Sequence, residues 1–156
     1  MPALAPDQCY RAIKPVDIGP TLAVMDKLDF FAAGLSSPKM YKCDVALNLP
    51  LEMEQLLDDL ELGGKLARAV ARRLAPRQSI PPHIDDWMPK EKDWRRFQVP
   101  LITDASVVMR WPDDGQETHL MAGWLYEVRF DRTHEVINEW DGERVHLQID
   151  QVDATI

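Results

Sequence analysis

Short segments of alternating apolar and polar residues fill the second half of the chain, and they restrict its fold more than any other feature. In residues 144–152, RVHLQIDQV, the apolar residues Val145, Leu147 and Ile149 alternate with polar ones. Successive side chains of a strand point to opposite faces of a sheet, so this segment predicts a strand with one apolar and one polar face. Three more segments are strand-length and rich in β-branched or aromatic residues: 96–103, 105–111 and 123–130. Several short strands at this spacing predict a sandwich or barrel.

The first 75 residues have a different composition and predict helices. Residues 20–34 carry apolar residues at three-residue spacing, between a proline suited to a first helical turn and a glycine suited to a stop. Residues 51–76 predict two more helices divided at a pair of glycines, with the basic run 65–73 forming the polar face of the second. Helices placed before the strands, rather than between them, predict a mainly β fold with N-terminal helices.

The length of 156 residues fits one domain that spans residues 1–156. The change from helix-forming to strand-forming residue patterns near residue 75 divides this domain into two parts. We expect residues 1–75 to form a helical part that packs on a barrel, and residues 76–156 to form the barrel itself.

Charge and hydropathy narrow the class of protein. The formal net charge of −8 argues against nucleic acid as a partner, because phosphate binding depends on clustered lysine and arginine. The longest apolar runs are too short to cross a bilayer. The N-terminus lacks a basic start followed by an apolar block, so the sequence favours a cytoplasmic protein.

The stretch SIPPHIDDW, residues 79–87, places His83 two positions before Asp85. If the chain is extended here, both side chains lie on one face and can bind one cation, whereas Asp86 would point the other way. His134 could supply a second imidazole from another strand. Two histidines and one carboxylate leave three positions open on an octahedral metal, an arrangement typical of non-haem Fe(II) oxygenases. The alternative interpretation of this stretch is a proline-stiffened acidic surface turn.

Arg144 opens the final alternating strand, beyond the second histidine. Its guanidinium could bind a small dicarboxylate through two parallel charge-assisted hydrogen bonds, which its planar geometry suits better than that of lysine. Alternatively, Arg144 pairs at the surface with Glu143 or Asp141. An HxD motif, a distal histidine and an arginine in this order match the pattern of Fe(II)- and 2-oxoglutarate-dependent dioxygenases.

The segments IPPHID, RRFQVPL, GWLYEVRFDRTHEVIN and ERVHLQID resemble, in order and spacing, those of one family of these enzymes, the aspartyl/asparaginyl β-hydroxylases. The resemblance covers roughly residues 76–150. It implies a double-stranded β-helix, a cupin-like jelly-roll core whose mouth holds the iron. It further implies that His83, Asp85 and His134 are the metal ligands, and that Arg144 binds the far carboxylate of 2-oxoglutarate.

The family also has an Arg-x-His pair near the cosubstrate. Arg96 matches its arginine, whereas Gln98 stands where the family has histidine, and glutamine cannot carry a charge. Arg95 and Arg96 alternate, so either could face inward.

The resemblance implies an enzyme that uses Fe(II), 2-oxoglutarate and dioxygen to hydroxylate a C–H bond, with release of succinate and carbon dioxide. The expected substrate is an aspartyl, asparaginyl or other amino-acid-type group, in a peptide or as a free small molecule. Two alternatives stay open. The chain could be a non-catalytic cupin-like module that binds a metal or a small molecule, or a metal-dependent isomerase or a dioxygenase that does not use 2-oxoglutarate.

Overall fold

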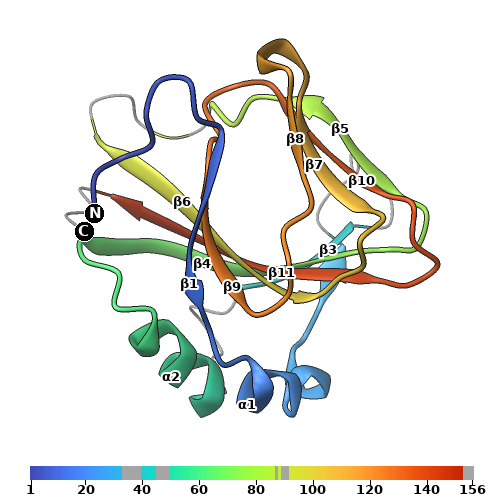
Figure 1. Ribbon diagram of the computed structural model, residues 1–156. Helices are drawn as coiled ribbons and strands as arrows, with labels where there is room; N and C mark the ends of the chain where they lie inside the picture. The colour runs from blue at the N-terminus through green and yellow to red at the C-terminus, as the bar shows by residue number, and fades with distance from the viewer. Residues whose placement is uncertain (33–39, 45–49, 87, 89–91, 153–156) are drawn as a thin grey trace.

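Two antiparallel sheets face each other in the computed structural model, which describes residues 1–32, 40–44, 50–86, 88 and 92–152 (Figure 1). The larger sheet has the order β1 (Tyr10–Pro15), β9 (Trp124–Val128), β6 (Trp94–Ile102), β11 (Arg144–Val152), β4 (Lys65–Leu74), β3 (Met40–Asp44) and β2 (Phe31–Ala32). The smaller sheet has the order β5 (Ser79–His83), β10 (His134–Asn138), β7 (Val107–Trp111) and β8 (Gln116–Thr118).

The chain alternates between these sheets in the manner of a jelly-roll. From β4 onward it passes from the larger to the smaller sheet and back until β11, so β9-β6-β11-β4 faces β5-β10-β7-β8. The first three strands extend the larger sheet beyond this eight-stranded core. The predicted mainly β fold with a jelly-roll core is therefore confirmed.

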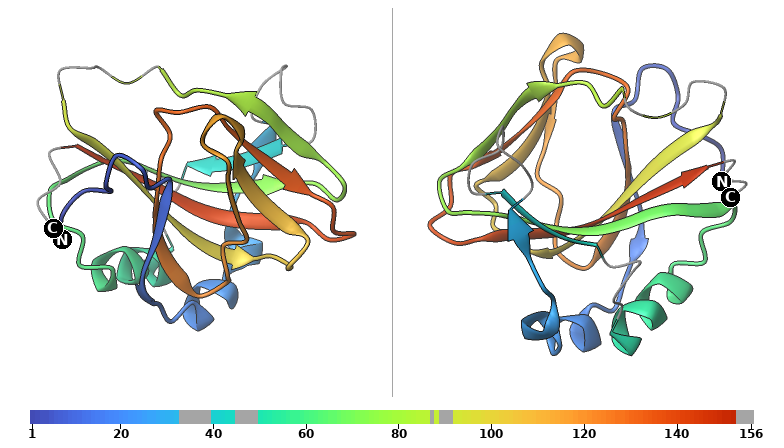
Figure 2. Two further views of the ribbon diagram at one scale, coloured as in Figure 1. Left: turned by 45° about the horizontal axis from the view of Figure 1, so that its top comes forward. Right: turned by 180° about the vertical axis from the view of Figure 1, so that it is seen from behind.

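Helices cover the outer face of the larger sheet, as both views in Figure 2 show. They are α1 (Gly19–Leu22), the 3-10 helix η1 (Met25–Lys27) and α2 (Leu51–Asp59), and a further 3-10 helix, η2 (Pro112–Asp114), precedes β8. Met53 and Leu56 of α2 join Leu147 and Ile149 of β11 in one buried apolar cluster. This packing buries the apolar set of β11, and the smaller sheet covers the polar set on the other face, so every residue of β11 is buried.

The predicted helix over residues 65–73 is wrong, because this run is strand β4. It pairs with β11 along its whole length and with β3 on its other side. The hydrogen bonds of two neighbouring strands outweigh the helix propensity of its alanines and arginines. Ala69 and Ala71 lie in the apolar cluster beneath the sheet, where their small side chains leave room for the helices.

The prediction of one helix over residues 20–34 is also corrected. The structure instead has a four-residue helix, a 3-10 turn and the short strand β2. Residues 1–75 are thus a mixture of helices and strands, and they contribute four strands to the larger sheet.

Polar side chains line the inner face of the larger sheet along β11, whereas Leu74, Tyr126 and Val128 on the same face join an apolar cluster with the smaller sheet. Arg144, His146, Gln148 and Asp150 alternate with the apolar residues of β11, so they face the smaller sheet. Directly opposed residues of neighbouring strands share a face, which adds the register partners Arg72 of β4 and Gln98 and Arg96 of β6. The candidate site is built on this polar surface.

Candidate functional site

Two histidines and an aspartate meet where β5 and β10 pair. His83 ends β5, His134 begins β10, and the two residues are direct register partners. Asp85 follows β5 and is held by its backbone N–H, which donates to the carbonyl of Phe130. One potential ligand atom from each of the three residues lies within 4.8 Å of the others.

Backbone hydrogen bonds select the ring nitrogen that each histidine offers. His83 Nδ1 lies 2.8 Å from the carbonyl oxygen of Pro81, and His134 Nδ1 lies 2.7 Å from that of Arg132. A carbonyl oxygen only accepts, so both Nδ1 atoms carry the proton and donate it. Each neutral ring then presents the lone pair of Nε2, the form in which imidazole binds metals.

Both Nε2 atoms face Asp85. His83 Nε2 lies 3.4 Å from Oδ1, and His134 Nε2 lies 3.6 Å from Oδ2. Burial alone would raise the pKa of Asp85, but its contacts with His83 and Arg96 outweigh this and hold the pKa well below its usual range. Burial lowers the pKa of His134, so this ring is neutral near pH 7. The contact with Asp85 raises the pKa of His83.

These three residues form a donor set that fits a divalent metal. The carboxylate is ionised and His134 is neutral, and metal ligands must be in these forms. The two lone pairs and the negative charge converge, and a cation between them would satisfy all three. Nitrogen and oxygen donors in this ratio suit Fe(II) with open coordination positions.

Arg96 supports the carboxylate of Asp85 through a hydrogen bond. Its guanidinium donates to Asp85 Oδ2 and, through Nε at 2.7 Å and Nη2 at 3.2 Å, to the two carboxylate oxygens of Asp150. The side chain of Arg96 is only 4% exposed and also lies over the ring of Phe130. Two carboxylates therefore neutralise this buried cation. Arg95 faces away and pairs with Glu127, which settles the question of which arginine points inward.

A cavity of about 410 Å³ extends from the two histidines along the inner face of the larger sheet. Arg144 lines it together with His146 and Gln98. Arg144 Nη2 lies 2.8 Å from His146 Nδ1, which lies 2.9 Å from Gln98 Oε1. The predicted residues Arg144 and Gln98 are thus brought together in the cavity that His83 and His134 also line.

Arg144 is buried without an acidic partner among the described residues; it is only 3% exposed. The surface pairs considered from the sequence do not form: Asp141 pairs with Arg77, and Glu143 lies near Arg73. Burial, and then the neighbouring charge of Arg72, lower the pKa of Arg144 to about 9. The residue is therefore a cation near pH 7, in a place where burial disfavours its charge.

Arg72 of β4 lines the same cavity, and sequence reasoning missed it. The predicted helix placed it on a solvated polar face. In a strand, Val70 and Arg72 would share one face, and Ala71 and Arg73 the other. The β-branched Val70 was the local signal that favours this interpretation. Its Nε donates to Gln148 Oε1 at 3.2 Å, and burial lowers its pKa to about 10.

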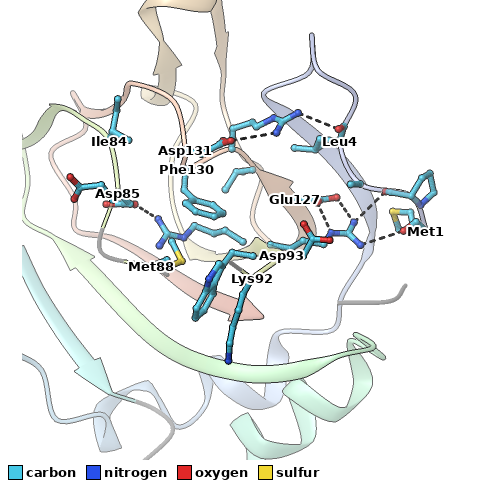
Figure 3. Close-up of a pocket in the computed structure, with 18 residues that line it drawn as sticks. Met1, Leu4, Ile84, Asp85, Met88, Lys92, Asp93, Glu127, Phe130 and Asp131 are labelled. Atoms are coloured by element: carbon cyan, nitrogen blue, oxygen red, sulfur yellow. Dashed lines mark hydrogen bonds and ion pairs between the residues drawn. The ribbon is translucent and has the colours of Figure 1, made fainter. Parts of the chain in front are cut away.

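A second cavity of about 790 Å³ lies on the other side of the Asp85–Arg96 pair, and among the described residues these two line both cavities. Figure 3 shows Asp85 and Ile84 at one end of it and Glu127 and Met1 toward the other. Asp86 is exposed and lines the second cavity but not the first. The two adjacent aspartates therefore differ in place, as their alternation predicts.

Comparison with solved structures supports the jelly-roll. A prolyl-4-hydroxylase from Pseudomonas putida has a TM-score of 0.69 at 14% identity, covering 92% of this chain and 91% of that one. An oxidoreductase of the 2OG-Fe(II) oxygenase family from Burkholderia pseudomallei has a TM-score of 0.68 at 13% identity, covering 91% and 84%. HygX from Streptomyces hygroscopicus, solved with nickel, 2-oxoglutarate and hygromycin B bound, has a TM-score of 0.67 at 9% identity, covering 92% and 82%.

At such low identity this likeness establishes the fold alone. No family model matches the sequence, and no curated protein matches it either. None of the three neighbours is an aspartyl/asparaginyl β-hydroxylase, so that narrower resemblance stays a prediction. Among the described residues, no helix is long and apolar enough to span a membrane.

Proposed function

We propose that this protein is an Fe(II)- and 2-oxoglutarate-dependent dioxygenase that hydroxylates a C–H bond. One observation carries the proposal: two histidines and a carboxylate converge at one part of a cavity that also holds a buried arginine without an acidic partner among the described residues. A metal-binding group and an anion-binding group in one enclosed space suit a cosubstrate that must contact both.

His83, Asp85 and His134 would bind the iron. When bound, iron and 2-oxoglutarate together activate dioxygen, so that one oxygen atom enters succinate, the other enters the substrate C–H bond as hydroxyl, and carbon dioxide leaves. The Nδ1–H groups of both histidines donate to backbone carbonyl oxygens, which fixes the rings in the metal-binding orientation. Arg96 keeps the Asp85 carboxylate ionised and oriented.

Arg144 would bind the far carboxylate of 2-oxoglutarate. A guanidinium presents paired N–H donors that match a carboxylate, and burial strengthens such a pair because water competes less. Gln98 lies next to His146 in this part of the cavity and would help to hold the arginine end of the network. Arg96 has both of its acidic partners in place, so we assign it to the support of Asp85 rather than to the cosubstrate.

The second cavity is the proposed place for the substrate. It reaches the metal site through Asp85, which lines both cavities, and it combines apolar residues such as Phe130 and Met88 with charged ones. A mixed lining of this kind suits an amino-acid-type substrate, free or within a peptide. An aspartyl or asparaginyl side chain is the proposal that the sequence resemblance adds.

The test supplies purified protein with Fe(II), ascorbate, 2-oxoglutarate and air, and measures succinate by mass spectrometry. We expect succinate from the wild type and from Asp86→Ala, and none above background from Asp85→Ala. Iron affinity should fall by more than about 100-fold in Asp85→Ala, because a ligand is lost rather than one of its supports. Equal iron affinity in the two variants would show that the metal ligand is misassigned.

A wild type that neither binds 2-oxoglutarate nor forms succinate, even with peptide and amino-acid substrates, would favour the non-catalytic binding module. If succinate forms, untargeted mass spectrometry for a gain of one oxygen atom identifies the substrate.

A further inference from the structure

The part of the cavity around Arg144 holds a second cation and an unused hydrogen-bond donor. Arg72 lies on the neighbouring strand, directly opposite His146 in the β4–β11 register. Arg72 and Arg144 are close enough for each charge to act on the other. Neither arginine forms an ion pair with a carboxylate in the part of the chain that the structure describes, although the charges of Asp85 and Asp150 reach Arg72 at longer range. Two like charges held together in a partly dry space call for an anion between them.

His146 is 4% exposed, and its Nε2 has no hydrogen-bond partner among the described residues. His146 Nδ1 lies 2.8 Å from Arg144 Nη2, which can only donate, and 2.9 Å from Gln98 Oε1, which can only accept. The arginine contact makes Nδ1 an acceptor, and this requires the Gln98 amide to turn its NH2 group, rather than Oε1, toward the ring. The proton of the neutral ring then lies on Nε2. A buried N–H without a partner is costly, and an acceptor supplied by a ligand removes this cost. Arg144 Nε is likewise buried and unpaired among the described residues.

We propose that Arg72 and His146 complete, with Arg144, a seat for the distal anionic group of the cavity ligand, and that this seat selects dianionic 2-oxoacids over monoanionic ones. The inference rests on the proposed function, since it concerns the cosubstrate of the same site. It adds two residues that act on one end of that molecule, away from the metal ligands.

The chemistry of the seat follows from its donors. Two guanidinium groups and an imidazole N–H offer only donors, so the seat favours a carboxylate over a hydroxyl or an amide. An amide would turn some of its own N–H groups toward these donors. The charge of one carboxylate balances only part of the two cations, which leaves the site attractive to a dianion as a whole.

The test titrates the Mn(II)-loaded protein with 2-oxoglutarate and with 2-oxobutyrate by isothermal calorimetry. Both ligands carry the 2-oxoacid group, and 2-oxobutyrate lacks the distal carboxylate. Arg72→Gln should lower the affinity for 2-oxoglutarate roughly tenfold and leave that for 2-oxobutyrate within about twofold. His146→Phe should act in the same direction, with a smaller loss, because it removes a neutral donor.

Arg68→Gln is the matched control. Arg68 lies on the same strand and the same face but does not line the cavity. Its removal takes away one positive charge that acts on Arg72 only at a distance and no group that lines the cavity, so both affinities should change by less than about twofold. Retained 2-oxobutyrate binding in Arg72→Gln also shows that the variant is folded and its metal site intact.

Two results overturn the inference: equal losses for the two ligands in Arg72→Gln, or a 2-oxoglutarate affinity in that variant equal to that of Arg68→Gln. These results are separate from the proposed function. Succinate formation by an Arg72→Gln protein with unchanged 2-oxoglutarate affinity would refute the seat and leave the function intact. Selective binding without succinate would do the reverse.

Discussion

The two faces of β11, the middle strand of the seven-stranded sheet, carry opposite kinds of side chain. On the outer face, Leu147 and Ile149 pack against helices in an apolar cluster. On the inner face, Arg144 and His146 are buried to the same degree but are polar. Burial stabilises the first set and disfavours the charge of the second. The buried charge of the inner face reduces stability, as expected if these residues serve binding, whereas the packing of the outer face supplies the stability that offsets this.

The largest change is expected on the outer face. Leu147→Ala removes a side chain that is fully buried against α2 and β6, and should lower the free energy of unfolding by about 3 kcal/mol. Urea denaturation measures it. The affinity for 2-oxoglutarate should be retained in the folded variant, because this residue faces away from the cavity. A loss of less than about 1 kcal/mol would mean that the outer face is not the stabilising one.

The buried ion pair at the edge of the inner face should give the next largest effect. Asp150→Asn removes one of two carboxylates that neutralise Arg96, and should lower the free energy of unfolding by about 2 kcal/mol. Thermal and urea unfolding provide the measurement. Asp86→Asn, at an exposed position, serves as the control and should change nothing. If both variants unfold alike, Arg96 does not depend on Asp150.

Arg144→Met should affect the use of 2-oxoglutarate much more than the free energy of unfolding. The variant loses the bond to His146 but also loses a buried charge without an acidic partner among the described residues, so the free energy of unfolding should change by less than about 1 kcal/mol. The concentration of 2-oxoglutarate needed for succinate formation should rise at least tenfold, with iron affinity unchanged. Destabilisation as large as that of Leu147→Ala would contradict a functional role for the inner face.

An exposed ion pair sets the lower limit of these effects. Glu117 is half exposed and pairs with Arg110 across β7 and β8. Glu117→Gln should change the free energy of unfolding by less than about 0.5 kcal/mol, and succinate formation should be unaffected. A change of 2 kcal/mol in the same denaturation assay would show that surface charge, rather than the two faces of the sheet, controls stability.

The alternation of β11 was readable because its apolar set contains Val, Leu and Ile, which favour strands, and its observed bounds are those of the predicted segment. In β4 the outer set is Ala69 and Ala71, small residues that favour a helix in isolation. Only the strands on both sides decide its state, and that information is not local. The same error hid Arg72, whose place in the cavity depends on the pairing of β4 with β11.

The convergence of His83, Asp85 and His134 was predictable for a different reason. His83 and Asp85 are spaced for one face of an extended segment, and the second histidine came from a pattern over distant residues. The pairing of Arg96 with Asp150 could not be predicted from the sequence. Asp150 lies far along the chain and contacts Arg96 only because of the register between β6 and β11. Long-range pairing thus determines which arginine supports Asp85, and which faces the cavity without an ion pair among the described residues.

A crystal structure of the protein with Mn(II) and 2-oxoglutarate, prepared without oxygen, would test the proposed metal ligands and the proposed cosubstrate arginine together. We predict one manganese ion bound by His83, Asp85 and His134, and the distal carboxylate of 2-oxoglutarate in contact with Arg144. Manganese bound elsewhere, or a 2-oxoglutarate molecule outside the cavity on the inner face, would contradict the account.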